Sequence, residues 1–369
     1  MTFQKFYSYD DVLLIPNLAS FSLEEISLRT HLISNIFLNI PIISAAMDTV
    51  TELLMATQMA KLGGVGVIHR NITPENQAFQ IKQLKQTPVD FTKYPLASLD
   101  QNQKLLVGAA VAPQDYLIRI PLLVEAGVDF VVFDVAHGDS TFTLNAITEC
   151  KKQFAIPIMG GNVATVDGTR RLIEAGSDAV KIGVGAGSIC TTRIICGIGI
   201  PQLSATLLCS EECLKHSIPC ISDGGLRYSG DIVKSIGAGA NVVMLGNMLA
   251  TTVESAGETI IQNNKSFKKY RGMGSMDAMT NGGSARYQSE QNKAIVPEGV
   301  EGLVPCSGYL DEVFHQIVTG IKKGMWYCGQ QTITHMNNYK KFIEITPAGL
   351  NESHAHDLLS IKSAPNYHK

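Results

Sequence analysis

The chain has 369 residues, of which 45% are hydrophobic and 17% charged, and its formal net charge is −3. This length and apolar content can supply one large core, whereas the balanced charge and the lack of a long Lys/Arg run argue against a nucleic-acid-binding surface. No apolar run is long enough to cross a membrane and the N-terminus lacks the basic and apolar regions of an export signal, so we expect a cytoplasmic protein.

Eight short apolar segments are predicted to be β-strands, and helix-compatible sequence separates most of them. In chain order they are residues 40–46, 64–68, 105–111, the end of 125–134, 156–160, 178–183, 218–222 and the end of 237–246. Three segments, 125–134, 174–183 and 237–246, repeat one pattern, in which a helix closed by glycine leads through a polar residue into an apolar strand. Eight such units predict an α/β fold with a closed parallel (β/α)8 barrel, and a doubly wound sheet is the alternative.

Residues 86–104, between the second and third predicted units, are expected to form a short linker. Pro88 and Pro95 favour extended backbone at the residues that precede them. A stretch of this length cannot form a second domain with its own core. We therefore expect a single catalytic domain over residues 1–369.

The segment 185–193 (GAGSICTTR) places one cysteine in a glycine-rich turn after the predicted sixth strand. Loops at the carboxyl ends of the strands hold the catalytic residues of barrel enzymes. Gly185 and Gly187 let a ligand approach the backbone, and Ser188 and the backbone N–H groups can donate to an anion. Cys190 is therefore a candidate nucleophile beside a phosphorylated substrate, and a tight turn with a buried thiol is the alternative.

Two further glycine turns follow the predicted seventh and eighth strands, at 222–225 (SDGG) and 245–247 (LGN). In (β/α)8 barrels these are the loops that most often bind phosphate, and we expect their donors to converge with Ser188. Because two anions repel, Asp223 is predicted to accept hydrogen bonds from ribose hydroxyls instead. For any single turn, the alternative is that its glycines only end the strand and bind nothing.

Two cysteines and two histidines are weaker candidates for a metal site. Cys209 and Cys213 are four residues apart and could share a helix face, and His354 and His356 flank one alanine. Neither pair has further ligands at a spacing typical of zinc sites. The eight cysteines are also too sparse for a disulfide scaffold, so core packing is favoured for the cysteine pair.

Several segments resemble those of a known enzyme family. Residues 44–52 (SAAMDTVTE), 185–193, 222–225, 244–246 (MLG) and 270–275 (YRGMGS) are similar to signature segments of IMP dehydrogenases and GMP reductases. Three others resemble the dehydrogenases specifically: 284–287 (SARY) their mobile flap, 296–302 (VPEGVEG) their nucleobase-contacting strand, and 346–354 (TPAGLNESH) their C-terminal cation segment. Residues 86–104 stand where members commonly carry a pair of cystathionine-β-synthase-type regulatory modules, so this is the form without them.

The resemblance implies NAD-dependent oxidation of IMP to XMP in guanine nucleotide synthesis. Cys190 would attack C2 of the purine, the nicotinamide would accept a hydride, and a covalent thioimidate would remain for hydrolysis. Two sets of residues could supply the hydrolytic base: Arg286 with Tyr287, on a flap at residues 272–300, or Thr192 relaying a proton to Glu298. Both possibilities stay open.

The resemblance also implies the binding residues and a homotetramer. Those for IMP are Ala45, Met47, Ser188, Asp223, Gly225, Gly246, Asn247, Tyr270, Gly272 and Glu298. Those for NAD are Asp134, Ala136, His137, Asn162, Lys181 and Gly183. A monovalent cation, K⁺, would be bound by Gly185, Gly187 and Cys190 together with a neighbouring subunit's Glu352, Ser353 and His354.

Three alternative functions are kept. An NADPH-dependent GMP reductase would share the cysteine loop and the missing modules. A flavin-binding barrel would explain the phosphate loops but not the single cysteine. A non-catalytic scaffold or nucleic-acid partner would leave Cys190, Thr192 and Arg286 without a role.

Overall fold

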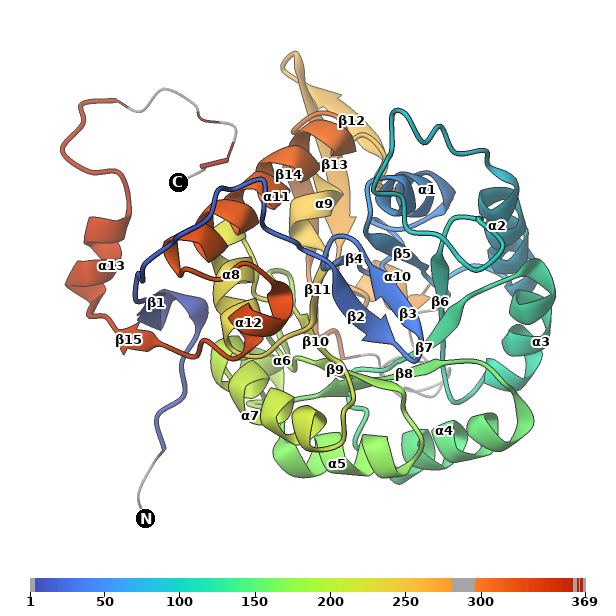
Figure 1. Cartoon of the computed structure of the whole chain (residues 1–369). Helices are drawn as coiled ribbons and strands as arrows, with labels where there is room; N and C mark the ends of the chain where they lie inside the picture. The colour runs from blue at the N-terminus through green and yellow to red at the C-terminus, as the bar shows by residue number, and fades with distance from the viewer. Residues whose placement is uncertain (1–3, 281–295, 361–363, 365, 368–369) are drawn as a thin grey trace.

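The computed structural model describes residues 4–280, 296–360, 364, 366 and 367 and contains a closed barrel of eight parallel strands (Figure 1). Each strand pairs with the next in the chain, and β11 closes the ring by pairing with β4. The strands are β4 (Ile42–Ser44), β5 (Val65–Ile68), β6 (Val107–Val111), β7 (Phe130–Asp134), β8 (Ile158–Val163), β9 (Ala179–Ile182), β10 (Cys220–Asp223) and β11 (Val242–Leu245). Each predicted segment overlaps one of them, so the predicted (β/α)8 barrel is confirmed.

Eight helices, one after each barrel strand, cover the outside of the ring. They are α1 (Leu53–Lys61), α2 (Pro74–Gln86), α3 (Tyr116–Ala126), α4 (Thr141–Gln153), α5 (Val166–Glu174), α7 (Gln202–Lys215), α8 (Ser229–Gly237) and α11 (Leu310–Tyr327). Along β7, Val131 and Phe133 pack outward against this layer, whereas Phe130 and Val132 pack inside the barrel. Burial on both faces explains why the strands are continuous apolar runs.

A hairpin that the sequence did not predict closes the amino-terminal end of the barrel. Strands β2 (Thr30–Ile33) and β3 (Ile36–Leu38) pair antiparallel and cross the centre of the ring in Figure 1. Their buried residues Leu32, Ile33 and Leu38 pack with the interior residues Val65 and Phe130. The opposite, carboxyl end of the strands is therefore the end that opens to a ligand.

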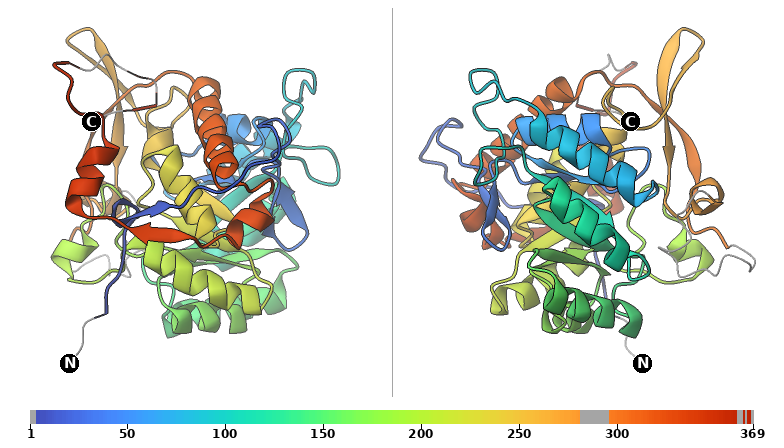
Figure 2. Two further views of the ribbon diagram at one scale, coloured as in Figure 1. Left: turned by 60° about the vertical axis from the view of Figure 1, so that its left-hand side comes forward. Right: turned by 90° about the vertical axis from the view of Figure 1, so that its right-hand side faces the viewer.

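A second segment outside the barrel, which we call the β12–β14 excursion, projects beside it, as the gold hairpin in Figure 2 shows. Strands β12 (Thr259–Gln262), β13 (Lys265–Arg271) and β14 (Glu301–Pro305) form an antiparallel sheet, and α10 (Met276–Thr280) follows β13. The excursion begins after the short helix α9 (Asn247–Ala250) and returns where Thr252 and Gly308 form a bridge. Its two ends are thus adjacent on the barrel.

The two terminal regions lie together at one side of the barrel. Strand β1 (Val12–Leu14), which follows the short helix η1 (Tyr9–Asp11), pairs antiparallel with β15 (Phe342–Glu344) after helix α12 (Ile333–Asn337). Helix α13 (Pro347–Ser353) lies beyond this pair, to the side of the barrel in Figure 1. The C-terminal extension expected from the sequence is therefore anchored to the N-terminal segment.

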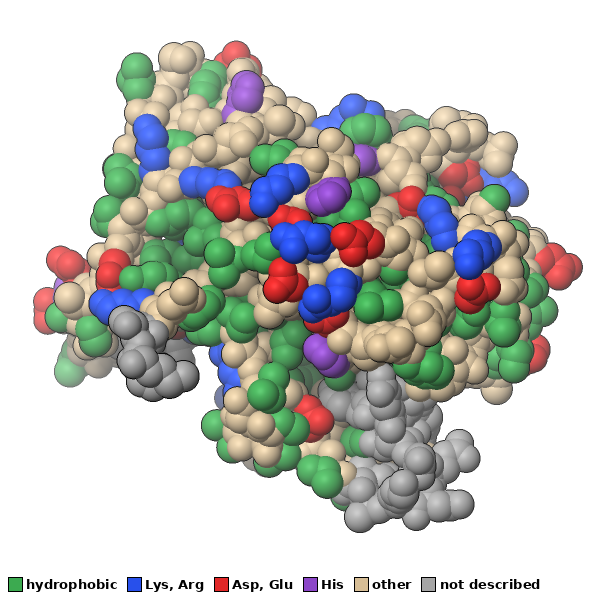
Figure 3. All heavy atoms as spheres, turned by 90° about the horizontal axis from the view of Figure 1, so that it is seen from below, with side chains coloured by type: hydrophobic (Ala, Val, Ile, Leu, Met, Phe, Trp, Pro, Cys, Tyr) green, Lys and Arg blue, Asp and Glu red, His purple; other side chains and the backbone are tan. Residues whose placement is uncertain are grey.

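Side chains of both signs are interspersed on the face seen in Figure 3. Ion pairs such as Arg171–Asp139, Arg170–Glu212 and Lys151–Asp178 link α4, α5 and α7 to each other and to neighbouring loops. Nucleic-acid binding usually requires a surface of predominantly positive charge, which this face does not present. Within the described ranges, each helix is too short or too polar to span a membrane.

Candidate active site

Two adjoining cavities open at the carboxyl ends of the barrel strands. Their volumes are about 680 and 290 Å³, and both are lined by Met47, Gly187, Asp223 and Tyr270. The larger also contains Cys190, and the smaller contains the glycine turns after β10 and β11. The candidate nucleophile and the candidate phosphate loops therefore face one continuous region.

Cys190 lies in the loop between β9 and the short helix α6 (Thr192–Ile195). Its thiol is partly buried, and its sulfur is 3.1 Å from the Thr192 hydroxyl oxygen. Thr192 in turn donates a hydrogen bond of 2.8 Å to Glu298 Oε2. A thiol, a hydroxyl and a carboxylate in series form a path by which a proton can leave the sulfur or a nearby water.

Backbone pairing holds Glu298 against the cysteine loop. The Thr191 N–H donates to the Glu298 carbonyl at 2.8 Å, and the Val300 N–H donates to the Ile189 carbonyl at 3.0 Å. Cys190 and Gly299 form the antiparallel bridge between these two bonds. The segment predicted to contact the nucleobase is therefore fixed beside the candidate nucleophile.

The smaller cavity contains several of the residues predicted to bind the nucleotide. It is lined by Ala45, Ser188, Gly225, Gly246 and Asn247, in addition to the shared residues. Burial raises the pKa of Tyr270 to about 12, and its hydrogen bond with Ser188 opposes the rise. The phenol therefore stays protonated near neutral pH and can donate to an anion.

Several residues of the smaller cavity were not predicted from the sequence. Tyr9, whose pKa burial raises to about 12, lies with its hydroxyl 3.2 Å from the Ser222 hydroxyl, and Gln202 donates to the same oxygen at 3.1 Å. Arg193 and Arg227 also line this cavity. Tyr9 precedes the first barrel strand by a long stretch and belongs to no motif, so no local signal marks it.

Most of the predicted cofactor residues line the larger cavity, but two lie beneath it. Ala136, His137, Asn162 and Gly183 face the cavity, as does Gly272 from the nucleotide set. Asp134 and Lys181 are buried and do not line either cavity; Lys181 instead bonds to Asp223, Asn162 and Asp134. A second, exposed thiol, Cys196, lines the cavity near Glu298 and was also not predicted.

The predicted cation residues are separated within one chain. Gly185, Gly187 and Cys190 line the larger cavity, whereas Glu352, Ser353 and His354 line neither cavity. His354 contacts the hydroxyl of Tyr367, which stacks on Tyr228. Arg286 and Tyr287 lie outside the described residues, which include only the two ends of the predicted flap, 272–280 and 296–300.

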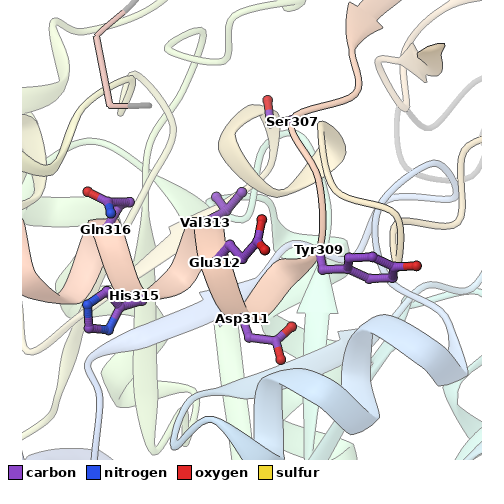
Figure 4. Close-up of a pocket in the computed structure, with 7 residues that line it drawn as sticks. All are labelled: Ser307, Tyr309, Asp311, Glu312, Val313, His315 and Gln316. Atoms are coloured by element: carbon purple, nitrogen blue, oxygen red, sulfur yellow. The ribbon is translucent and has the colours of Figure 1, made fainter. Parts of the chain in front are cut away.

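A third hollow of about 650 Å³ lies at the start of α11, away from the predicted site residues (Figure 4). It is lined by Ser307, Tyr309, Asp311, Glu312, Val313, His315 and Gln316. Among the residues that the structure describes, no group of three or more His, Cys, Asp and Glu side chains could hold a metal ion, and Cys209 and Cys213 are buried in the core.

Comparisons with known proteins identify the family of the chain. A family model described as the IMP dehydrogenase / GMP reductase domain matches residues 6–356. The chain is 42% identical over 392 residues to an inosine-5'-monophosphate dehydrogenase of Cryptosporidium parvum, with 98% of each protein covered. The enzyme of that name from Borreliella burgdorferi is 43% identical over 393 residues, covering 96% of this chain and 97% of the relative.

Relatives of two lengths occur among these matches. The inosine-5'-monophosphate dehydrogenase of Bacillus subtilis is 36% identical over 474 aligned positions, with 98% of this chain and 97% of the relative covered. That alignment is longer than the 369 residues of this chain, so the relative contains residues without a counterpart here. The shorter alignments show that proteins near the present length also occur under the same name.

Proposed function

The chain belongs to the IMP dehydrogenase / GMP reductase family and is an oxidoreductase, and we propose that it converts IMP to XMP with NAD⁺ as hydride acceptor, in guanine nucleotide synthesis. The observation that carries this proposal is the series of contacts from the Cys190 thiol through Thr192 to Glu298 in the larger cavity. A thiol with a path for its proton is the arrangement that nucleophilic catalysis needs.

The first half of the reaction forms a bond between the Cys190 sulfur and C2 of the purine. The thiol proton passes through Thr192 to Glu298. The hydrogen at C2 then leaves as a hydride with its electron pair, and the nicotinamide ring of NAD⁺, when bound, supplies the acceptor. The oxidised purine remains joined to Cys190 as a thioimidate.

The second half of the reaction hydrolyses that thioimidate. Water adds to C2, the sulfur departs, and XMP is released with an oxygen atom derived from water. Thr192 and Glu298 can take the proton of this water, provided that Glu298 has first lost the thiol proton, and its partly exposed side chain permits exchange with solvent. Arg286 with Tyr287 remains the second candidate, although an unperturbed guanidinium is a weak base.

The two cavities divide the binding of the substrates. In our proposal the smaller cavity takes the phosphate through Ser188, Gly225, Gly246, Asn247 and Tyr270, and Asp223 at its junction with the larger cavity takes the ribose hydroxyls. NAD⁺ would occupy the larger cavity against Ala136, His137, Asn162 and Gly183. This arrangement presents C2 to Cys190 from one side and to the nicotinamide from the other.

A monovalent cation, K⁺, and a homotetramer are part of this proposal. The backbone carbonyls of Gly185, Gly187 and Cys190 belong to one glycine-rich loop and are oxygen ligands of the kind that such a cation requires. Since His354 lies beside Tyr367 rather than at this loop, Glu352, Ser353 and His354 would have to come from a neighbouring subunit. The eight free thiols are also compatible with the reducing cytoplasm that we propose as its location.

One assay tests the proposed function directly. IMP with NAD⁺ should produce NADH and XMP, whereas GMP with NADPH should release no ammonia. Ammonia from GMP would instead identify a GMP reductase. A bound yellow chromophore without NADH production would favour the flavin-binding alternative, and salt-sensitive nucleic-acid binding without turnover would favour a non-catalytic role.

A further inference from the structure

A buried lysine lies beneath the junction of the two cavities. Lys181 Nζ is 2.7 Å from Asp223 Oδ2 and 3.1 Å from Asp134 Oδ1, and it also donates to Asn162 Oδ1. Only 1% of the Lys181 side chain is exposed. An ammonium has three donors, and these three acceptors use all of them. In this arrangement Lys181 has no donor left for a bound dinucleotide.

Strand register explains how one lysine reaches both carboxylates. Asp134 on β7 is paired with Gly161 on β8, and Gly161 is paired with Lys181 on β9. A Cβ atom at position 161 would lie 2.6 Å from Lys181 Cβ, closer than real side chains approach. The glycine therefore leaves room for Lys181 beside β8, so that its ammonium can reach the carboxylate two strands away.

Asn162 bonds both to Lys181 and to Asp223, which lines the smaller cavity. Its side-chain nitrogen donates to Asp223 Oδ2 at 2.9 Å and to the Gly183 carbonyl at 2.8 Å. The bonds from Asn162 and Lys181 both end on Oδ2 of Asp223. The other carboxylate oxygen is then available to ribose, and the Asp223 side chain is 19% exposed where the cavities meet.

We infer that Lys181 is a positioning residue that couples the binding of the nucleotide to the binding of the dinucleotide. The inference rests on the proposed function, in which Asp223 holds the ribose of IMP. It also rests on the place of Asp134 at the end of β7, two residues before Ala136 in the loop that lines the larger cavity. When ribose hydroxyls donate to Asp223, the bond between Asp223 and the Lys181 ammonium weakens, and the bond between Lys181 and Asp134 strengthens. Each ligand thus orders the network that the other needs, and the effect is reciprocal.

The test measures this coupling in the full-length Cys190→Ala protein, in which turnover is blocked. Calorimetry gives the Kd of NAD⁺ with and without saturating IMP, and the Kd of IMP with and without NAD⁺. We expect each ligand to tighten the other by a factor within the usual range of about 5 to 150. Adding Lys181→Met should reduce this factor to about one, and adding Lys181→Arg should retain part of it.

A second buried lysine provides a matched control. Lys85 lies between Asp100 and Asp129, at 2.9 and 2.7 Å, and lines neither cavity. Adding Lys85→Met to the Cys190→Ala protein should leave the coupling factor unchanged. Loss of coupling in this control would show that any buried lysine has the same effect and would overturn the inference.

A third variant keeps the inference testable if Lys181→Met does not fold. Asp134→Asn leaves the Lys181–Asp223 pair in place, yet it should weaken IMP binding about tenfold, as loss of a charged hydrogen bond implies, although Asp134 does not line the nucleotide cavity. Unchanged IMP binding in Asp134→Asn, or unchanged coupling in a folded Lys181→Met, would overturn the inference. Binding of both ligands to Cys190→Ala without coupling would overturn it and leave the proposed function intact. Failure of Cys190→Ala to bind either ligand would overturn both.

Discussion

Thr192 donates a hydrogen bond of 2.8 Å to Glu298 although 106 positions separate the two residues in the chain. The bond joins the loop that carries the Cys190 thiol to a segment of the β12–β14 excursion. Because the Cys190 sulfur lies 3.1 Å from the same hydroxyl, one residue touches both the nucleophile and the candidate base. Loss of the Glu298 carboxylate should therefore affect both halves of the proposed reaction.

Replacing Cys190 with serine should abolish turnover and preserve nucleotide binding. A neutral hydroxyl is a much weaker nucleophile than a thiolate, whereas the proposed phosphate and ribose contacts come from other side chains. NADH formation and calorimetric IMP affinity should be measured on the same sample. Activity above a few per cent of the parent rate would remove the covalent step from the mechanism.

Arg286→Ala should leave a near-stoichiometric burst of NADH while it slows steady-state turnover. Loss of a general base typically costs about 10² to 10⁴-fold, and only the hydrolytic half of the reaction should be affected. Quenched samples should contain a nucleotide attached to Cys190, detectable by mass spectrometry. Disappearance of the burst would instead assign Arg286 to substrate binding or hydride transfer.

Glu298→Gln tests the other candidate for the hydrolytic base, which is the path from Thr192 to Glu298. If the Thr192–Glu298 path dominates, this variant should slow hydrolysis more than Arg286→Ala does. Because Glu298 also receives the thiol proton in the first half of the proposed reaction, the variant should slow the NADH burst as well, whereas Arg286→Ala should not. Steady-state and single-turnover NADH formation measured on both variants gives the comparison. A fast hydrolytic step in Glu298→Gln would show that the Glu298 carboxylate contacts the nucleobase and does not act as the hydrolytic base.

Tyr270→Phe should raise the KM for IMP about tenfold and change kcat little. The phenol is buried and protonated, lines both cavities and can donate a charge-assisted bond to phosphate. Tyr116→Phe is the matched control, because Tyr116 packs against Phe133 and lines neither cavity. An equal change in both variants would indicate a general effect of removing a buried hydroxyl.

Asp129 predicts a specific pH dependence of stability. Burial raises its pKa to about 6, and the neighbouring Lys85 ammonium opposes the rise. Between roughly pH 4 and 6 the folded protein then holds a proton that the unfolded chain has released, so the free energy of unfolding falls as pH rises, by at most about 1.4 kcal/mol per pH unit. Above pH 6 the contribution should be constant.

Urea unfolding of the parent and Asp129→Asn at several pH values isolates this contribution. As pH rises through the window of roughly 4 to 6, the free energy of unfolding of the parent should fall relative to that of Asp129→Asn. Above this range the difference between the two proteins should stay constant. Adding Lys85→Met to the parent should extend the window to higher pH. A parent that gains stability relative to the variant over this range would show that the lysine outweighs burial.

The barrel could be predicted because burial on both faces gives its strands an unambiguous sequence pattern. The segments around β7, β9 and β11 repeat that pattern, and the ring follows chain order. The β12–β14 sheet lacks it, since β13 contains Lys265, Lys268 and Lys269. Lys268 is buried all the same, donating to the Ser255 carbonyl at 3.0 Å, and its burial lowers its pKa. Such a tertiary contact has no local signal.

The candidate site could be predicted where it lies in glycine turns and only by resemblance elsewhere. Ser188, Asp223 and Gly246 lie at or after strand ends, in motifs whose residue types indicate their chemistry. The sequence placed Lys181 among the cofactor residues, but only the register of β7, β8 and β9 shows that its donors are already used. Tyr9 reaches the smaller cavity through packing of a distant segment, which single-sequence patterns do not encode. Cys196 directly follows the short helix α6 after the predicted motif 185–193 and belongs to no motif of its own.

The bridge between Thr252 and Gly308 brings the two ends of the excursion together, and the Ser307 N–H donates to the Thr251 carbonyl at 2.7 Å beside it. An insertion whose ends meet can be exchanged between relatives without altering the path of the host chain. A chimaera with this barrel and a relative's residues between these two positions would keep its own cysteine and glycine turns. It would acquire Tyr270 and Glu298 from the donor, so that the nucleophile and its proposed proton acceptor would come from two different relatives.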